Sequence, residues 1–148
     1  MDLFLKLLLA VLLGSLVGIE RTIAHKKAGM RTYTLVSLGA CLFILVSEQM
    51  RPLLAVYPGF NPVMMASQII AGIGFIGAGL IIFQHNNLQG LTTAAGLWVT
   101  AGVGMAVGYG LFLLATTASI LTLIVFTLFW WVEQKITPIF SRDDDMDQ

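Results

Sequence analysis

The sequence predicts an all-α fold, a polytopic membrane helix bundle with about five transmembrane helices. The first observation behind this prediction is that residues 52–132 contain no Lys, Arg, Asp or Glu. A helix in a soluble protein keeps one polar face toward water, whereas a helix surrounded by lipid tolerates apolar residues on every face. The second observation is the composition, with 57% hydrophobic residues, 11% charged residues and a mean hydropathy of +0.89. Together they exclude an ordinary soluble domain.

Five segments have the length and apolar character that a membrane crossing needs, about 17 to 25 residues. The first is interpreted as an uncleaved anchor, because Asp2 interrupts the basic start of a signal peptide and no Ala-x-Ala cleavage site follows. The second segment is short, and the boundary between the fourth and fifth falls at a tight connection near Gly110. The predicted spans are residues 3–19, 32–46, 63–83, 91–110 and 111–131.

The eight basic residues are distributed unevenly between the two sides of these spans. Lys and Arg close to span ends favour the cytoplasmic side of a membrane. One side receives Arg21, Lys26, Lys27, Arg31, Lys135 and Arg142, and the other side receives Lys6 and Arg51. The sequence therefore predicts an N-terminus outside the cytoplasm and a C-terminus inside it.

The C-terminal segment differs from the rest of the chain. Its last eight residues, 141–148, include four aspartates and few apolar residues, so they have little to bury. We therefore divide the chain into a transmembrane domain, residues 1–135, and a cytoplasmic acidic tail, residues 136–148, which is expected to be disordered.

Small residues are dense in the third and fourth predicted spans, above all in residues 71–79. Helices in lipid have little hydrophobic drive to associate, so close backbone approach at small residues becomes the main adhesive. We expect the face that contains Gly74 to touch the face of the next span that contains Gly104, and Leu80 to face lipid. The residues assigned to helix packing are Gly14, Gly18, Gly72, Gly74, Gly77, Gly79, Gly96, Gly104 and Gly108.

Residues 72–77 also match the dinucleotide-binding pattern G-x-G-x-x-G, and we reject that interpretation. The pattern needs a preceding strand and an acidic residue about 20 positions later that binds the ribose. No acidic residue follows until Glu133. We expect no bound cofactor. His85 has no carboxylate or thiol neighbours, so no metal ligands are assigned either.

A few polar residues in or near the spans are candidates for function. Ionisable groups at the membrane boundary are costly unless paired, so Glu20 is expected to pair with Arg31, with Arg21 binding lipid phosphate as an alternative. Simple anchoring by snorkelling of these side chains at the interface is the plainer alternative to pairing. The hydroxyl and amide groups either make interhelical hydrogen bonds or line a polar pocket. The functional candidates are Glu20, Arg21, Arg31, Thr32, Gln68, Thr92 and Thr93.

Four motifs resemble, in order and spacing, the membrane domain of the bacterial MgtC/SapB family. They are residues 18–21 (GIER), 28–32 (AGMRT), 68–79 with the glycine-rich run, and 90–98 (GLTTAAGLW). The resemblance implies a multi-pass inner-membrane protein linked to growth and stress survival when magnesium is scarce. In some members it implies restraint of the membrane ATP synthase. It also implies a short form of the family, since longer members continue into a cytoplasmic domain.

Two functional hypotheses follow. Mg²⁺ usually needs carboxylate ligands, and the third to fifth predicted spans contain none. The leading hypothesis is therefore a non-enzymatic membrane protein that modulates a partner membrane complex. The alternative is a small oligomeric cation (Mg²⁺) transporter or channel. An enzyme is not expected, because no nucleophile with an adjacent base is present and no catalytic residue can be assigned.

The same reasoning gives the expected partners. They are the lipid bilayer and either a second copy of the chain, in a homo-oligomer such as a dimer, or another integral membrane protein. A chain of this composition is not expected to bind nucleic acid.

Overall fold

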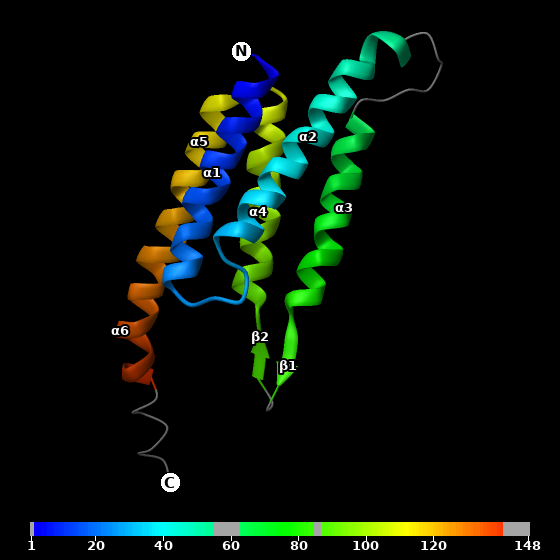
Figure 1. Cartoon of the computed structure of the whole chain (residues 1–148). Helices are drawn as coiled ribbons and strands as arrows, with labels where there is room; N and C mark the ends of the chain where they lie inside the picture. Colours follow the sequence, from blue (N-terminus) through cyan, green and yellow to red (C-terminus); the bar gives the residue numbers. More distant parts are fainter. Residues whose placement is uncertain (1, 55–62, 85–86, 141–148) are drawn as a thin grey trace.

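The computed structural model describes residues 2–54, 63–84 and 87–140 of the chain. Helices make up nearly all of this part, with one short β-hairpin between two of them (Figure 1). In chain order the elements are α1 (Leu3–Ile23), α2 (Met30–Leu54), α3 (Val63–Leu80), β1 (Ile82–Gln84), β2 (Asn87–Gln89), α4 (Leu91–Gly108), α5 (Phe112–Ile124), the π-helical η1 (Val125–Phe129) and α6 (Trp130–Phe140).

The helices run alternately up and down an elongated bundle, and α5, η1 and α6 form one continuous rod (Figure 1). Within the described residues, four helices are long and apolar enough to cross a membrane: Leu3–Ile23, Met30–Pro52, Leu91–Gly108 and Phe112–Ile136. The apolar part of α3, Met64–Leu80, is shorter. The predicted all-α membrane helix bundle is confirmed, and its third predicted span corresponds to this shorter helix.

Several predicted boundaries differ from the observed ones. Helices α1 and α2 extend beyond residues 19 and 46, because polar residues at the end of a span leave the lipid without ending the helix. The third predicted span is too long, since residues 82–84 form β1 and pair antiparallel with β2. Helix α6 continues to Phe140, and the division of the chain at residue 135 stays a prediction. The acidic residues of the tail lie outside the described part of the chain.

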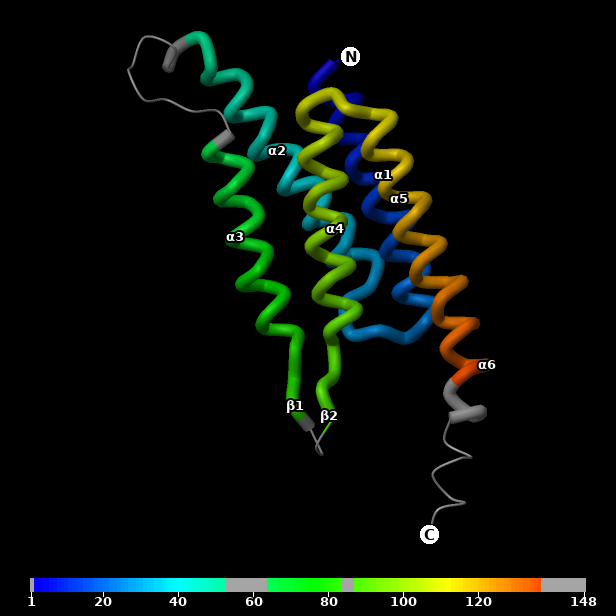
Figure 2. The backbone as a smooth tube through the Cα atoms, turned by 180° about the vertical axis from the view of Figure 1, so that it is seen from behind, coloured from blue at the N-terminus to red at the C-terminus, as the bar shows by residue number. Residues whose placement is uncertain are grey.

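Helix α4 is the central helix of the bundle, lying between α3 on one side and α1 and α5 on the other, against α2 (Figure 2). Its share of buried residues, 56%, is the highest among the four candidate spans. A central helix must be approached from several directions, and small residues permit that. Glycine and alanine supply much of its buried surface, and apolar clusters on both sides contain Val107, Leu97 and Ala101.

Helix α2 is held between α1 and α4 at glycines. A Cβ atom added to Gly104 would lie 2.1 Å from the carbonyl oxygen of Ser37, and one added to Gly14 would lie 2.7 Å from the Ser37 Cβ. Towards one end of the bundle, a Cβ on Gly18 would lie 2.6 Å from the Met30 Cα. Towards the other end, a Cβ on Gly108 would lie 2.8 Å from the Ile44 Cβ. The backbones therefore touch where only glycine fits.

The expected contact between the Gly74 face of α3 and the Gly104 face of α4 is wrong. A Cβ on Gly72, Gly74 or Gly79 would meet nothing within 4 Å, and one on Gly77 would make an ordinary 3.5 Å contact with the Ala94 Cβ. The larger residues Ile69 and Ile73 form the buried side of α3.

Leu80 does not face lipid as expected, since it packs against the buried cluster around Leu97. The physical reason for both corrections is that isoleucine and leucine fill the space beside α4 better than the smaller residues. Those smaller residues are left on the outer side of α3.

Replacing Gly104 by Ala should destabilise the bundle strongly, because the new methyl group has no space beside the Ser37 carbonyl. Overpacking of this kind costs about 1–3 kcal/mol. Gly102 lies on the same helix and is the matched control, since a Cβ there would meet nothing within 4 Å. Thermal unfolding of both variants in detergent checks the prediction. Equal losses for Gly104→Ala and Gly102→Ala would show that the α2–α4 contact is not where the structure places it.

Candidate functional site

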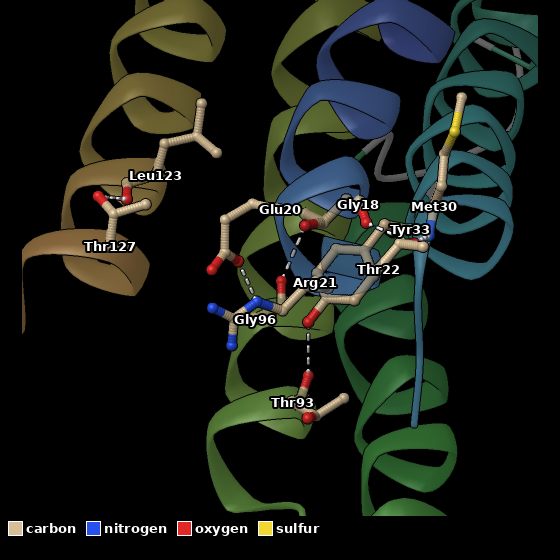
Figure 3. Close-up of polar contacts among 11 residues, drawn as sticks. Gly18, Glu20, Arg21, Thr22, Met30, Tyr33, Thr93, Gly96, Leu123 and Thr127 are labelled. Carbon is tan, nitrogen blue, oxygen red and sulfur yellow. Dashed lines mark hydrogen bonds and ion pairs between the residues drawn. The ribbon is translucent and has the colours of Figure 1, made fainter. Parts of the chain in front are cut away.

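Arg21 lies in the last turn of α1 and is only 3% exposed, although it carries a charge. Its Nε–H donates a hydrogen bond to the Oε2 atom of the neighbouring Glu20 (Figure 3). Its Cζ atom lies 3.6 Å from the centroid of the Phe126 ring, which belongs to η1. An ion pair and an aromatic face thus stabilise the buried guanidinium.

The expected pair between Glu20 and Arg31 is wrong. Arg31 lies exposed in the first turn of α2 and makes no ion pair with any described residue. Adjacent residues can pair without ordering a loop between them, so Glu20 and Arg21 meet at little cost in conformational entropy.

Beside Arg21, a buried hydrogen bond joins α2 to α4. The Tyr33 hydroxyl donates to the carbonyl oxygen of Thr93 at 3.1 Å (Figure 3). Gly96 makes room for it, because a Cβ there would lie 2.6 Å from the Tyr33 hydroxyl oxygen and 2.4 Å from the Cζ of Phe126. Sequence reasoning missed Tyr33 and Phe126. A tyrosine in an apolar span signals a hydrogen-bond partner, whereas nothing distinguishes Phe126 from the other phenylalanines.

The connection between α1 and α2 is held by Thr22. Its hydroxyl donates to the carbonyl of Gly18 at 3.1 Å and accepts the backbone N–H of Met30 at 2.8 Å (Figure 3). Gly29 is required beside it, since a Cβ there would lie 2.6 Å from the Thr22 Oγ1. This connection places Lys26 near the end of α1, where His25 adopts a positive φ of 53°.

A cavity of about 370 Å³ adjoins Arg21 at this end of the bundle, and we call it the Arg21 pocket. It brings together three of the sequence-predicted candidates, Arg21, Thr92 and Thr93, with Glu20 next to it through its ion pair. The polar part of its lining consists of Arg21, Lys26, Thr92, Thr93 and Glu133.

The candidates Thr32 and Gln68 lie elsewhere, in a groove of about 610 Å³ between α2 and α3. We call it the α2–α3 groove. Its other lining residues are apolar or glycine, and a Cβ added to Gly39 or Gly72 would meet nothing within 4 Å. The groove is therefore open along a glycine-containing surface on both of its helices.

The opposite end of the bundle carries few charges. Glu48 and Arg51 form an exposed ion pair at 2.8 Å, and the Lys6 Nζ donates to the carbonyl of Gly108 at 2.9 Å. Burial raises the pKa of the Tyr109 phenol above its ordinary value, and the nearby Glu48 carboxylate raises it further. The described residues contain no group of three or more His, Cys, Asp or Glu side chains that could hold a metal ion.

Comparison with known proteins identifies the family to which this chain belongs. The family model described as "MgtC family" matches residues 7–135. The chain belongs to the MgtC family. The resemblance predicted from the four motifs is confirmed, and the chain is a multi-pass membrane protein.

Several bacterial relatives share its sequence. This MgtC-family chain is 39% identical over 130 residues to "Putative magnesium transporter YhiD" of Escherichia coli K12, a match covering 86% of this chain and 60% of the relative. It is 42% identical over 135 residues to "Protein MgtC" of Salmonella typhimurium LT2, covering 91% and 55%. It is 43% identical over 116 residues to "Protein MgtC" of Brucella abortus, covering 78% and 46%. The chain thus spans about half the length of these curated relatives. No solved structure matches it significantly.

Glu20 and Arg21 of this MgtC-family protein should be energetically coupled. Removal of one charge leaves its buried partner unpaired, at a cost of about 3 kcal/mol, so Glu20→Gln and Arg21→Gln together should cost less than the sum of the single losses. Thermal or denaturant unfolding in detergent gives the coupling energy. The matched control pairs Glu20→Gln with Arg31→Gln, whose losses should add. Additive losses at Glu20 and Arg21 would rule out the ion pair.

Proposed function

We propose that this protein is a non-enzymatic, multi-pass protein of the bacterial inner membrane that modulates a partner membrane complex during adaptation to low magnesium. The observation that carries the proposal is the uncovered glycine-rich side of α3. Gly72, Gly74 and Gly79 have open space beside them, and much of the rest of α3 is exposed. The magnesium link rests on the name of one relative, "Putative magnesium transporter YhiD" of Escherichia coli K12.

An uncovered glycine surface is well suited to helix contacts between membrane proteins. Lipid chains pack against apolar helices without a need for glycine, whereas a second helix gains from close backbone approach at small residues. The α2–α3 groove continues this surface and adds the amide of Gln68 and the hydroxyl of Thr32, which are able to hydrogen-bond to a polar group on the arriving helix. A transmembrane helix of another integral membrane protein is our proposed occupant, and a second copy of this chain is the alternative.

A small oligomeric cation transporter is the second candidate, supported by the name of the E. coli relative. Mg²⁺ keeps several of its waters and is usually bound by carboxylates. Among the described residues, Glu20 is paired with Arg21 and Glu48 with Arg51, at opposite ends of the bundle. A pore would therefore have to form between copies of the chain. The transporter ranks second because the described residues supply few carboxylate ligands for Mg²⁺.

The proposed orientation places the N-terminus outside and the C-terminus in the cytoplasm, because Lys26 and Lys27 lie at the same end as the Arg21 pocket and α6 (Figure 1). Single cysteines in a Cys41→Ala background test it with a membrane-impermeant thiol reagent. Arg51→Cys should be labelled in intact spheroplasts, and Lys27→Cys only after permeabilisation. The reverse labelling pattern would overturn this orientation.

The proposed role of the α3 surface in partner binding is tested by a larger side chain at a position where the chain alone has space for it. Gly74→Leu should leave the thermal unfolding midpoint close to that of wild type, because nothing lies within 4 Å of its Cβ, and propensity alone changes helix stability by about 1 kcal/mol or less. It should abolish co-purification of the partner complex and impair growth in low magnesium. Thr117→Leu, which adds bulk to the exposed side of α5, is the matched control and should retain both.

Two results would contradict this function. If Gly74→Leu keeps the partner and supports growth, α3 is not the contact surface. If the purified wild-type chain forms an oligomer without other proteins and moves Mg²⁺ into liposomes, the transporter candidate replaces the modulator.

A further inference from the structure

We propose that the Arg21 pocket binds a singly charged phosphate ester, the group carried by phospholipids. The same chemistry is found in free phosphate compounds, so the source has to be separated by experiment. The proposal rests on three observations at one cavity: donors of a buried arginine that have no acceptor in the described part of the chain, an uncapped helix N-terminus and the charge of the surrounding wall. None of them depends on the α3 surface, so this site and the proposed function can fail separately.

The guanidinium of Arg21 has more N–H donors than acceptors among the described residues. It carries five N–H groups, and in the structure only its Nε–H has an acceptor, the Glu20 carboxylate. The two terminal nitrogens have no acceptor among the described residues, although the side chain is only 3% exposed and lines the cavity. Neither nitrogen is among the fully buried atoms that lack a hydrogen-bond partner, so both are accessible from the cavity. A bidentate acceptor such as a phosphate would satisfy both nitrogens, since the fork of a guanidinium matches phosphate oxygens.

The N-terminus of α4 opens into the same cavity. Its N-cap is Gly90, with a φ of 92° and no side chain to accept a hydrogen bond. The first intrahelical bond in this turn runs from Ala94 N–H to the Gly90 carbonyl, so the N–H groups of residues 91–93 have no intrahelical acceptor. The positive end of an 18-residue helix, with free N–H groups and the hydroxyls of Thr92 and Thr93 beside it, favours an anion.

The geometry also explains why no side chain caps this helix. A Cβ at position 90 would lie 2.1 Å from the carbonyl oxygen of Leu80. Ser, Thr, Asp or Asn, the usual capping residues, are therefore sterically excluded, besides being disfavoured at this φ. The N–H groups stay available for a ligand as a consequence of the tight hairpin between α3 and α4.

The charges around the cavity favour a singly charged ligand. Glu20 balances Arg21, and the remaining charged lining residues are Lys26 and Glu133. With the Arg21–Glu20 pair, the wall contains two cationic and two anionic side chains, so it offers no surplus of positive charge for a dianion, which disfavours inorganic phosphate and monoesters. Trp130, which also lines the cavity, belongs to a residue type enriched at the level of lipid headgroups. The phosphodiester of a phospholipid fits this wall best.

The test uses the full chain in detergent with phosphatidylglycerol as the probe, and native mass spectrometry with thermal shift as readouts. Wild type should bind the lipid, whereas diacylglycerol, which lacks the phosphate, should not bind. Lys26→Gln and Thr92→Val, at exposed residues whose loss leaves the fold intact, should each weaken binding by about threefold to tenfold. Arg21→Gln should weaken it further. Arg31→Gln, at an exposed basic residue outside the pocket, is the matched control and should bind like wild type.

Glycerophosphoglycerol, the free phosphodiester that remains when phosphatidylglycerol loses its acyl chains, is added without lipid to separate the two sources. Stabilisation by phosphatidylglycerol alone assigns the site to a lipid headgroup, and stabilisation by the free diester that is lost in Thr92→Val assigns it to a soluble phosphodiester. Either result supports a phosphate site. The proposal is overturned if no phosphate probe binds, if diacylglycerol binds as well as phosphatidylglycerol, or if the pocket variants bind like Arg31→Gln.

Discussion

The contact of α2 with α1 and α4 at glycine positions is the constraint on which the rest of the structure depends. Ser37 lies at its centre, with Gly14 on one side and Gly104 on the other, and their separations leave no room for a methyl group. In lipid this closeness replaces the hydrophobic drive that would hold such helices together in water. It has a cost, because the Ser37 Oγ is buried without a hydrogen-bond partner. Leaving a buried hydroxyl unsatisfied costs about 1–3 kcal/mol, which the packing of α2 against its neighbours has to offset.

The same contact sets the geometry around Arg21. By fixing the distance between α2 and α4, it brings the Tyr33 hydroxyl to the Thr93 carbonyl. Gly96 then leaves space for the Phe126 ring, which in turn covers the Arg21 guanidinium. A buried charge near lipid is expensive unless its surroundings are fixed. Helix packing in the middle of the bundle therefore makes the charged pocket at its end possible.

Hydropathy predicted the fold class because the free energy of placing a helix in lipid is roughly a sum over residues, which sequence supplies directly. The choice of ion-pair partner cannot be obtained by such a sum, since it depends on the three-dimensional arrangement of the side chains. Four basic residues follow Glu20 within the next eleven positions, and the sequence does not say that Arg21 is the one that pairs with it. The Phe126 ring above that pair comes from a helix distant in sequence. Glycine density indicated close packing, but it did not say whether each glycine packs inside this chain, and for Gly74 the structure shows open space.

The uncovered side of α3 and the Arg21 pocket are separate features, yet they share a structural element. Helix α3 ends at Leu80, whose carbonyl oxygen leaves no room for a side chain at Gly90, the residue that begins α4 at the pocket. The β1–β2 hairpin also connects the C-terminal end of α3 to the N-terminal end of α4. A helix that binds along α3 and displaces it would therefore press on Gly90 as well as on the other parts of α4 that α3 contacts. Because Gly90 has no spare volume to absorb such a displacement, the N–H groups that follow it would move as well, so a partner on α3 and a ligand at Arg21 would act on one mechanical unit.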